Sequence, residues 1–231
     1  MDINRHPLIS VIIPTYNEAA TITETLEHLR PWNNQLEIIV VDGGSNDGTS
    51  KLINQGVKLI QAPRGRASQM NAGASLACGE ALLFLHSDTR LPHDFLRQIE
   101  SSLSDSSIVG GAFKMKIDHP GLFFYLTSLG SNLRAAVTGI YFGDQAIFAR
   151  RESFFKIGCF PPIDIMEDWE FSLSMRKAGK TVLLPGPVKT SARRWLLHGK
   201  WRTTWLMHKI KVLYLLGTRP ADLKKMYSDR R

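Results

Sequence analysis

The sequence predicts an α/β protein with a doubly wound parallel sheet, followed by a helical C-terminal extension. Two apolar segments, residues 8–13 and 36–41, each lead directly into a polar loop. Strand-like and helix-like patterns then alternate through the first half of the chain. Basic residues, in contrast, gather after residue 188. Ligands bind at the carboxyl ends of strands in such sheets, so the polar loops are the first candidates for a site.

The first half predicts a β-α-β-α-β-α-β order with right-handed crossovers. After the strand at 8–13, a helix is expected over residues 19–30, because Ile22, Leu26 and Leu29 recur at helical spacing and Pro31 ends the helix. The elements that follow are a strand at 36–41, a short helix near 49–54, a strand at 57–60, a helix from about 67 to 77, a strand at 81–85 and a helix that starts at Pro92.

The second half is less regular. Residues 108–117 predict a longer strand, in which Gly110 and Gly111 allow a bulge or a close backbone approach. A helix over residues 168–178, ended by Gly179, and a strand over 181–184 follow later.

Residues 120–143 are apolar with one charge, Arg134, and are long enough to raise the question of a membrane span. Several glycines and Asn132 interrupt the segment, and no flanking signal supports a span. We therefore expect a helix packed over the mouth of the site.

The net charge of +8 is unevenly placed along the 231 residues. Residues 189–231 hold twelve Lys and Arg and two acidic residues, whereas residues 1–188 hold seventeen basic and nineteen acidic residues. A basic tail favours an anionic partner: phosphate groups, lipid headgroups or nucleic acid. Residues 201–216 predict an amphipathic basic helix that carries Trp201, Trp205, Ile210, Leu213 and Leu216 on one side.

The compartment is predicted to be the cytoplasm. Residues 1–7 contain no apolar signal core. Cys78 and Cys159 lie far apart without a C-x-x-C pair, so we interpret both as small buried thiols in a reducing environment.

Asp42 ends the strand at 36–41 and precedes Gly43 and Gly44. A carboxylate there can accept a hydrogen bond from a base imide or a ribose while the glycines let the backbone approach the ligand. An ordinary turn aspartate is the alternative.

Asp88 follows the strand at 81–85, at the same sheet edge as Asp42. An oxygen ligand there suits Mg²⁺ or Mn²⁺, which bind few protein carboxylates when phosphates supply other ligands. Such an ion would neutralise a departing diphosphate. A turn aspartate before Pro92 is the alternative, and the neighbouring His86 could be a surface turn residue.

Glu167 and Asp168 open a predicted helix, where the dipole alone would favour carboxylates. The functional alternative is that one of them removes a proton from an acceptor hydroxyl. Arg64, Arg66 and Gln69 flank another helix start and could bind phosphate, or could form a solvated basic loop.

Four ordered motifs together resemble glycosyltransferase family 2, which has the GT-A fold. They lie at residues 11–18, 41–49, 84–88 and 166–173, and read VIIPTYNE, VDGGSNDGT, FLHSD and MEDWEFSL. The resemblance spans roughly residues 8–185. It implies a GT-A catalytic domain over residues 1–188, divided into a nucleotide-binding half (1–105) and an acceptor half (106–188), with a basic helical extension over 189–231.

The resemblance also implies roles for individual residues. Asp88 matches the last aspartate of the Asp-x-Asp motif and would hold a Mn²⁺ or Mg²⁺ ion against the diphosphate. Asp168 matches the general base of an inverting transfer from a nucleoside-diphosphate sugar to an acceptor hydroxyl. Asp42 would recognise the base, and the remaining donor-binding residues would be Pro14, Tyr16, Glu18, Arg66, Gln69, His86 and Ser87.

Two departures from the family pattern stand out. His86 replaces the first aspartate of Asp-x-Asp, although a neutral imidazole can still bond ribose or a metal. The Gln-x-x-Arg-Trp motif of processive members is reduced to SARRW at residues 191–195, so polymer synthesis is not expected; Arg193, Arg194 or His198 could approach the diphosphate.

The segment at 65–73 and Gly143-Asp144-Gln145 resemble a small soluble branch associated with arsenosugar biosynthesis. In that branch Asp144 and Gln145 would face the acceptor, or would form a strand-entry turn.

Two other functions remain open on the sequence alone. A sugar-nucleotide nucleotidyltransferase normally needs a glycine-rich basic triphosphate loop, whereas this chain has Pro14-Thr15-Tyr16-Asn17-Glu18 at that place. A non-catalytic membrane or anion binder would use the basic tail. No nucleic-acid motif is present, so binding to nucleic acid is not expected. The helix at residues 201–216 could contact an anionic membrane; a helix that packs on the core with a solvated basic face is the commoner case. The sequence leaves the oligomeric state open.

Overall fold

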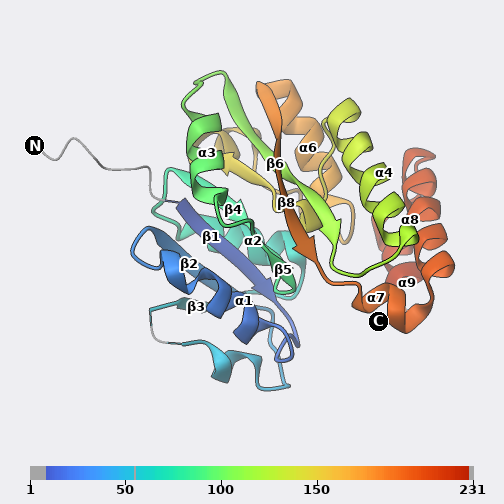
Figure 1. Ribbon diagram of the computed structural model, residues 1–231, viewed down its shortest axis with the longest axis horizontal. Helices are drawn as coiled ribbons and strands as arrows, with labels where there is room; N and C mark the ends of the chain where they lie inside the picture. Colours follow the sequence, from blue (N-terminus) through green and yellow to red (C-terminus); the bar gives the residue numbers. More distant parts are fainter. Residues whose placement is uncertain (1–8, 55, 229–231) are drawn as a thin grey trace, which may run out of the picture.

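One curled, eight-stranded sheet organises the molecule in this computed structural model, which describes residues 9–54 and 56–228 (Figure 1). The strand order is β3-β2-β1-β4-β7-β6-β8-β5. Its strands are β1 (Ile9–Thr15), β2 (Leu36–Asp42), β3 (Lys58–Gln61), β4 (Ala81–Phe84), β5 (Thr89–Arg90), β6 (Ile108–Ile117), β7 (Phe148–Arg150) and β8 (Lys180–Thr190). Strands β1 to β4 pair in parallel, as do β6 and β8, whereas β7 runs antiparallel between β4 and β6 and β5 runs antiparallel to β8.

Helices cover both faces of this sheet (Figure 1). The α-helices are α1 (Ile22–Leu29), α2 (Arg66–Ser75), α3 (Phe95–Leu103), α4 (Leu122–Thr138), α5 (Arg151–Ile157), α6 (Glu167–Ala178), α7 (Arg193–His198), α8 (Lys200–Leu215) and α9 (Pro220–Ser228). Short 3-10 helices occur at η1 (Arg30–Trp32), η2 (Thr49–Leu52) and η3 (Gly143–Gln145).

The apolar runs of the central strands explain why the sheet is buried on both sides. In β1, Val11 and Ile13 join the core beneath α1 and α3, whereas Ile12 joins the core beneath α2 and α6. Strand β2 alternates in the same way. Continuous apolar strands of this kind are typical of parallel sheets in α/β proteins.

The predicted α/β class and the order of the first-half elements are confirmed. Strands β5 and β7 and helix α5 were not predicted, and β8 is longer than the predicted strand at 181–184. The Gly110–Gly111 prediction is confirmed: a Cβ at Gly111 would collide with the Val182 carbonyl, and the β6–β8 register shifts beside Gly110. The predicted absence of an N-terminal signal concerns residues outside the described part.

The helix expected over the mouth of the site lies elsewhere. Helix α4 runs along β6, with Phe124, Ser128 and Ala135 buried (Figure 1). Asn132 binds both backbone groups of Met115, at 2.8 and 2.9 Å. These inward polar contacts hold α4 on the sheet. The loop that follows α4, and not the helix, reaches the carboxyl ends of the central strands, where the site was predicted. Among the described residues, no helix combines the length and apolar character needed to cross a membrane.

The predicted apolar side of residues 201–216 is wrong in part. Helix α8 packs inward through Thr203, Leu206 and Ile210, which are buried, whereas Trp201 and Trp205 face solvent. Leu206 and Ile210 form a small core with residues before α6 and on α9, namely Ile165, Met166 and Leu223. The C-terminal helices are therefore packed against the segment that precedes α6.

The prediction of buried thiols is wrong for Cys78, which is exposed because it lies in the turn that precedes β4. Cys159 is partly buried, and both cysteines are free thiols.

Candidate active site

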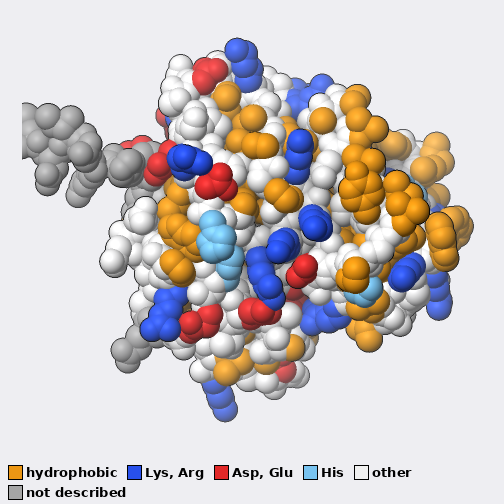
Figure 2. Space-filling view, viewed as in Figure 1, with side chains coloured by type: hydrophobic (Ala, Val, Ile, Leu, Met, Phe, Trp, Pro, Cys, Tyr) orange, Lys and Arg blue, Asp and Glu red, His pale blue; other side chains and the backbone are white. Residues whose placement is uncertain are grey.

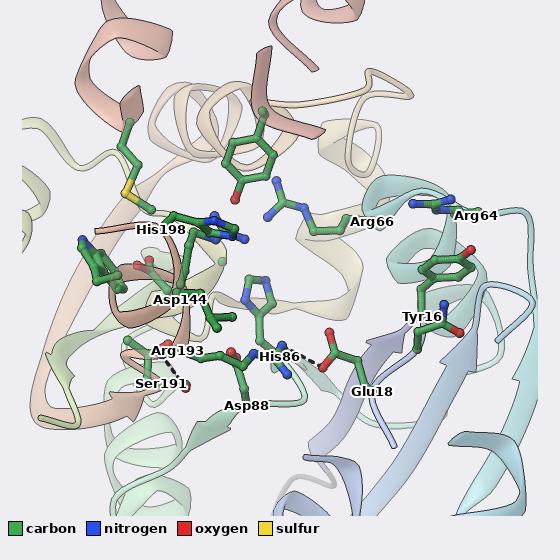
Figure 3. A pocket seen from close by; sticks show the side chains of 18 residues that line it. Tyr16, Glu18, Arg64, Arg66, His86, Asp88, Asp144, Ser191, Arg193 and His198 are labelled. Atoms are coloured by element: carbon green, nitrogen blue, oxygen red, sulfur yellow. Dashed lines mark hydrogen bonds and ion pairs between the residues drawn. The ribbon is translucent and has the colours of Figure 1, made fainter. Parts of the chain in front are cut away.

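A cavity of about 520 Å³ opens at the carboxyl ends of β1 and β4 (Figure 3). Tyr16 and Glu18 reach it from the loop after β1, and His86 and Asp88 reach it from the loop after β4. The opposite wall comes from η3 and from the C-terminal helices. The sheet thus brings together the predicted residues Tyr16, Glu18, Arg66, His86 and Asp88.

Charges of both signs face this cavity. Arg193 lies 3.3 Å from the Glu18 carboxylate, and the Arg64 guanidinium lies 3.8 Å above the Tyr16 ring (Figure 3). The further lining arginines are Arg66 and Arg194. Such a mixture of carboxylates and guanidinium groups suits a ligand that carries both phosphate and a cation.

Asp88 brings a carboxylate to the cavity from the loop after β4. Burial raises its pKa, and the charge of Glu18 raises it further, while Arg193 and Arg194 oppose the shift. Within the described ranges, no three His, Cys, Asp or Glu side chains form a metal-binding group. The residues present suit an ion such as Mg²⁺ or Mn²⁺ that binds few protein carboxylates and takes its other ligands from phosphates, with Asp88 as the carboxylate in the cavity.

Asp168 lies behind the main cavity, at the first turn of α6. Its carboxylate accepts hydrogen bonds from the Gly143 N–H at 3.0 Å and from the Trp169 N–H at 2.9 Å. It lines a small hollow that shares His86 and Gly143 with the main cavity. A Cβ at residue 143 would collide with the His86 ring, so glycine lets the backbone of η3 lie close to that ring.

Asp144 faces the main cavity directly (Figure 3). Burial raises the pKa of its carboxyl group; Arg134 opposes the shift and Asp168 adds to it. Gln145, the other acceptor-side candidate, is buried instead, and its side chain binds Arg134 at 2.9 Å.

Arg66 links the cavity to the carboxylates of α6. Its Nε lies 2.7 Å from Oε1 of Glu167, which is almost fully buried, and the second oxygen of Glu167 has no hydrogen-bond partner. Burial opposes the Arg66 charge, but Glu167 and Asp168 keep its pKa above the usual value. Burial raises the pKa of Glu167, and Arg66 opposes that shift.

We expect Arg66→Met to lower the free energy of unfolding by about 3 kcal/mol, because it leaves a buried carboxylate without its cation. Losing the cation raises the Glu167 pKa further, so the folded protein then binds a proton more tightly than the unfolded chain. The variant therefore loses more of its free energy of unfolding at about pH 8 than at about pH 5, because Glu167 is closer to protonation at the lower pH.

Urea unfolding at the two pH values measures this difference. Arg64→Met is the matched control, since Arg64 is exposed and lies over an aromatic ring; it should cost about 1 kcal/mol or less. Equal losses for the two variants would contradict the ion-pair explanation.

Four predicted donor-binding residues do not line the main cavity: Pro14, Asp42, Gln69 and Ser87. The Asp42 carboxylate accepts bonds from the backbone N–H groups of Gly44 and Ser45 and from the Ser45 hydroxyl. Burial opposes its charge, but the bonds from Ser45 hold its pKa below the usual value. Its contact with the base stays a prediction.

Gln69 is buried and ties three segments together. Its amide donates to the carbonyls of Thr15 and Val41, at 2.7 and 2.8 Å, and its oxygen accepts from the Gly65 N–H. Ser87 is buried, and its carbonyl accepts a bond from Thr25 at 2.6 Å. Both residues thus support the loops that carry the cavity residues.

Sequence reasoning missed part of the cavity wall. Trp195, Leu197, Met207 and Tyr227 line it from α7, α8 and α9, beside Arg193, Arg194 and His198. Arg194 lies 4.5 Å over the Tyr227 ring, which joins α7 to α9. No local pattern marks Met207 or Tyr227, because their contribution depends on how the extension folds back.

The sequence of this chain is similar to those of known glycosyltransferases. Residues 10–161 match the family described as Glycosyl transferase family 2. The chain is 30% identical over 181 residues to a PGL/p-HBAD biosynthesis glycosyltransferase of Mycobacterium bovis BCG, covering 72% of this chain and 69% of that protein. It is 29% identical over 190 residues to an uncharacterized glycosyltransferase of Haemophilus influenzae, covering 77% and 75%.

Solved structures show the same fold. The mannosyltransferase PcManGT from Pyrobaculum calidifontis, in complex with GDP-Man and Mn²⁺, matches with a TM-score of 0.69 at 22% identity, covering 96% of this chain and 68% of that one. S. aureus TarS 1-349 in complex with UDP-GlcNAc matches with a TM-score of 0.63 at 21% identity, covering 79% and 58%.

Proposed function

Because this chain belongs to glycosyl transferase family 2, we propose that it moves a sugar from a nucleoside-diphosphate donor to an acceptor hydroxyl with inversion at the anomeric carbon. The observation that carries the proposal is the cavity at the β1 and β4 ends, where Asp88 and Glu18 meet several arginines. The family match favours this activity over the nucleotidyltransferase and the non-catalytic binder.

The donor would bind in the cavity, against the side lined by the loops after β1 and β4. Tyr16 would contact the nucleoside, while Arg193 and Arg194 would neutralise the diphosphate oxygens from the opposite wall. His86 would donate or accept a hydrogen bond at the ribose. The bound GDP-Man of PcManGT and UDP-GlcNAc of TarS support a sugar nucleotide as the donor class.

Asp88 would hold a divalent ion, with Glu18 nearby. Asp88 and Glu18 both line the cavity, so an ion shared with the diphosphate would balance their charge. Such an ion, when bound, supplies positive charge to the leaving diphosphate. The Mn²⁺ of the PcManGT complex supports this assignment.

Asp168 would accept the proton of the attacking hydroxyl. The two backbone N–H bonds fix its carboxylate, and its hollow shares the lining residues His86 and Gly143 with the cavity. The hydroxyl oxygen then forms the new bond to the anomeric carbon as the bond to the diphosphate breaks on the opposite side, which inverts that centre. Asp144 would contact the acceptor from the cavity wall.

The direct test is thermal unfolding with UDP, GDP, CDP and dTDP, each with and without Mn²⁺. We expect one diphosphate to stabilise the protein by about 2.7 kcal/mol at a hundred times its dissociation constant, and only with Mn²⁺. The corresponding sugar nucleotide should then yield a glycoside of inverted configuration. Stabilisation by none of the four, or retention of configuration, would contradict the proposal.

A further inference from the structure

Three helices present exposed apolar side chains to solvent. On α4, the exposed side chains are Leu122, Tyr125, Leu126, Leu129, Leu133 and Val137, each 50–75% exposed. On α7 and α8 they are Leu196, Trp201, Trp205, Val212 and Leu215. We call this set the α4–α8 face. Figure 2 shows hydrophobic side chains gathered over this side of the molecule.

The α4–α8 face is not needed to hold the fold together. Helix α4 uses its opposite side, with Phe124 and Ser128, to pack on β6. Its one charge, Arg134, turns inward to bind Gln145 and the Ile140 carbonyl. Phe123 meets Trp201 with ring centroids 5.1 Å apart, so the two helices form one surface. Contiguous exposed apolar patches of this kind mark interaction surfaces.

The charge around the α4–α8 face has one sign. Neither residues 119–143 nor residues 189–221 contain an acidic side chain. Lys200 lies over the Phe124 ring of α4 and Lys209 over the Trp205 ring, and Arg202 of α8 is exposed, whereas Arg193 and Arg194 line the cavity and do not count toward this face. A second copy of the chain docked through the same face would bring like charges together. The charge therefore favours an anionic occupant.

The mixture of side chains identifies that occupant. Trp201 is 79% exposed, and Lys209 lies 4.9 Å over the Trp205 ring. Exposed tryptophans among aliphatic side chains, with lysine and arginine beside them, are typical of surfaces that enter the headgroup layer of a bilayer. We propose that the α4–α8 face docks on the surface of an anionic membrane.

This placement has a consequence for the acceptor, which rests on the proposed function. Leu197 lines the catalytic cavity and is 71% exposed, so α7 joins the cavity wall to the α4–α8 face. With that face in the headgroup layer, the hydroxyl of a membrane lipid can enter the cavity while its apolar part stays in the bilayer. The structure thus points to a lipid-borne hydroxyl as the acceptor.

Co-sedimentation with vesicles tests the docking. We expect binding to phosphatidylcholine vesicles that contain phosphatidylglycerol, weakened by salt, and little binding to pure phosphatidylcholine. The triple variant Leu129→Gln/Leu133→Gln/Trp201→Ser should lower the partition coefficient about tenfold or more. The matched control is Leu52→Gln/Leu59→Gln/Leu76→Gln, which changes exposed leucines near the β3 edge; it should change binding less than about twofold.

Three outcomes would overturn the docking proposal: no binding to anionic vesicles, equal binding to neutral vesicles, or equal losses in both triple variants. So would a dimer, seen by light scattering, that only the face variant dissociates. Thermal shift with nucleoside diphosphates separates this proposal from the proposed function. Vesicle binding without any nucleotide response would refute the function and leave the docking intact.

Transfer assays test the acceptor class. The face variant should lose transfer to a hydroxyl lipid in anionic vesicles and keep transfer to a short-chain, water-soluble acceptor, because its cavity is unchanged. Equal activity of the variant and the original chain on vesicle-borne acceptor would contradict a lipid-borne substrate.

Discussion

Replacing Asp168 with asparagine is expected to lower the turnover number about a hundredfold to ten-thousandfold, the usual contribution of a general base. The amide fills the same space but cannot take the hydroxyl proton. Donor affinity should stay within a few-fold, because Asp168 lies behind the cavity wall that would receive the nucleotide. Single-turnover kinetics with titrated sugar nucleotide measure both quantities.

The structure also predicts a small stability effect for this variant. Asp168 accepts N–H bonds from Gly143 and Trp169 with different oxygens, and asparagine retains only one acceptor oxygen. One backbone donor then loses its partner, at about 1 kcal/mol. The variant should therefore melt slightly earlier but remain folded, so that the lost turnover is chemical in origin.

Asp144→Asn is the matched comparison, since Asp144 is the nearby carboxylate that faces the main cavity. We expect it to raise the KM for the acceptor more than it lowers turnover. If Asp144→Asn abolished turnover while Asp168→Asn kept it, the general base would be Asp144 and the assignment of Asp168 would be wrong.

Replacing Asp88 with alanine should remove the Mn²⁺-dependent part of nucleoside-diphosphate affinity, a loss of about tenfold to a hundredfold. Asp88 is a half-buried carboxylate, and burial and the charge of Glu18 together raise its pKa, so a bound cation would stabilise its charged form. Calorimetric titration of the diphosphate with Mn²⁺ and with a chelator measures the difference.

The diphosphate affinity of Asp88→Ala should equal that of the original protein measured with a chelator, because the variant loses only the contribution of the ion. Asp94→Ala serves as the control, since it makes the same substitution at a residue that lies before α3 and does not line the cavity. Unchanged Mn²⁺-dependent affinity in Asp88→Ala would refute the metal assignment, whereas an equal loss in Asp94→Ala would point to a general effect on the fold.

Local pattern predicted most of the first half of the fold. The apolar runs of β1, β2 and β4 and the helical spacing of α1 lie in short stretches of sequence, so each was found within a few residues. Strand β8 was predicted too short because Pro185 and Pro187 interrupt it, and its pairing survives through a register shift opposite Phe113 and Met115. Strand β7 is three residues long and carries no periodicity that could be detected.

The candidate site was predicted in part. Tyr16, Glu18, His86 and Asp88 follow strand ends, and the parallel sheet necessarily brings such loops to one edge. Gln69 was assigned to the donor from its neighbourhood in the chain, but burial turns its amide toward the carbonyls of Thr15 and Val41. Residue type alone does not distinguish these two uses of a polar side chain.

The amino-acid order by itself determined the strand and helix sequence, the polar loops after β1 and β4, and the concentration of positive charge after residue 188, because periodicity and composition are local properties. Only the tertiary structure decided that α7 to α9 close the cavity, that α4 lies along β6, and that Trp201 and Trp205 face solvent. Those outcomes depend on which of two apolar sides of a helix finds a partner, and that choice is made by residues distant in the chain.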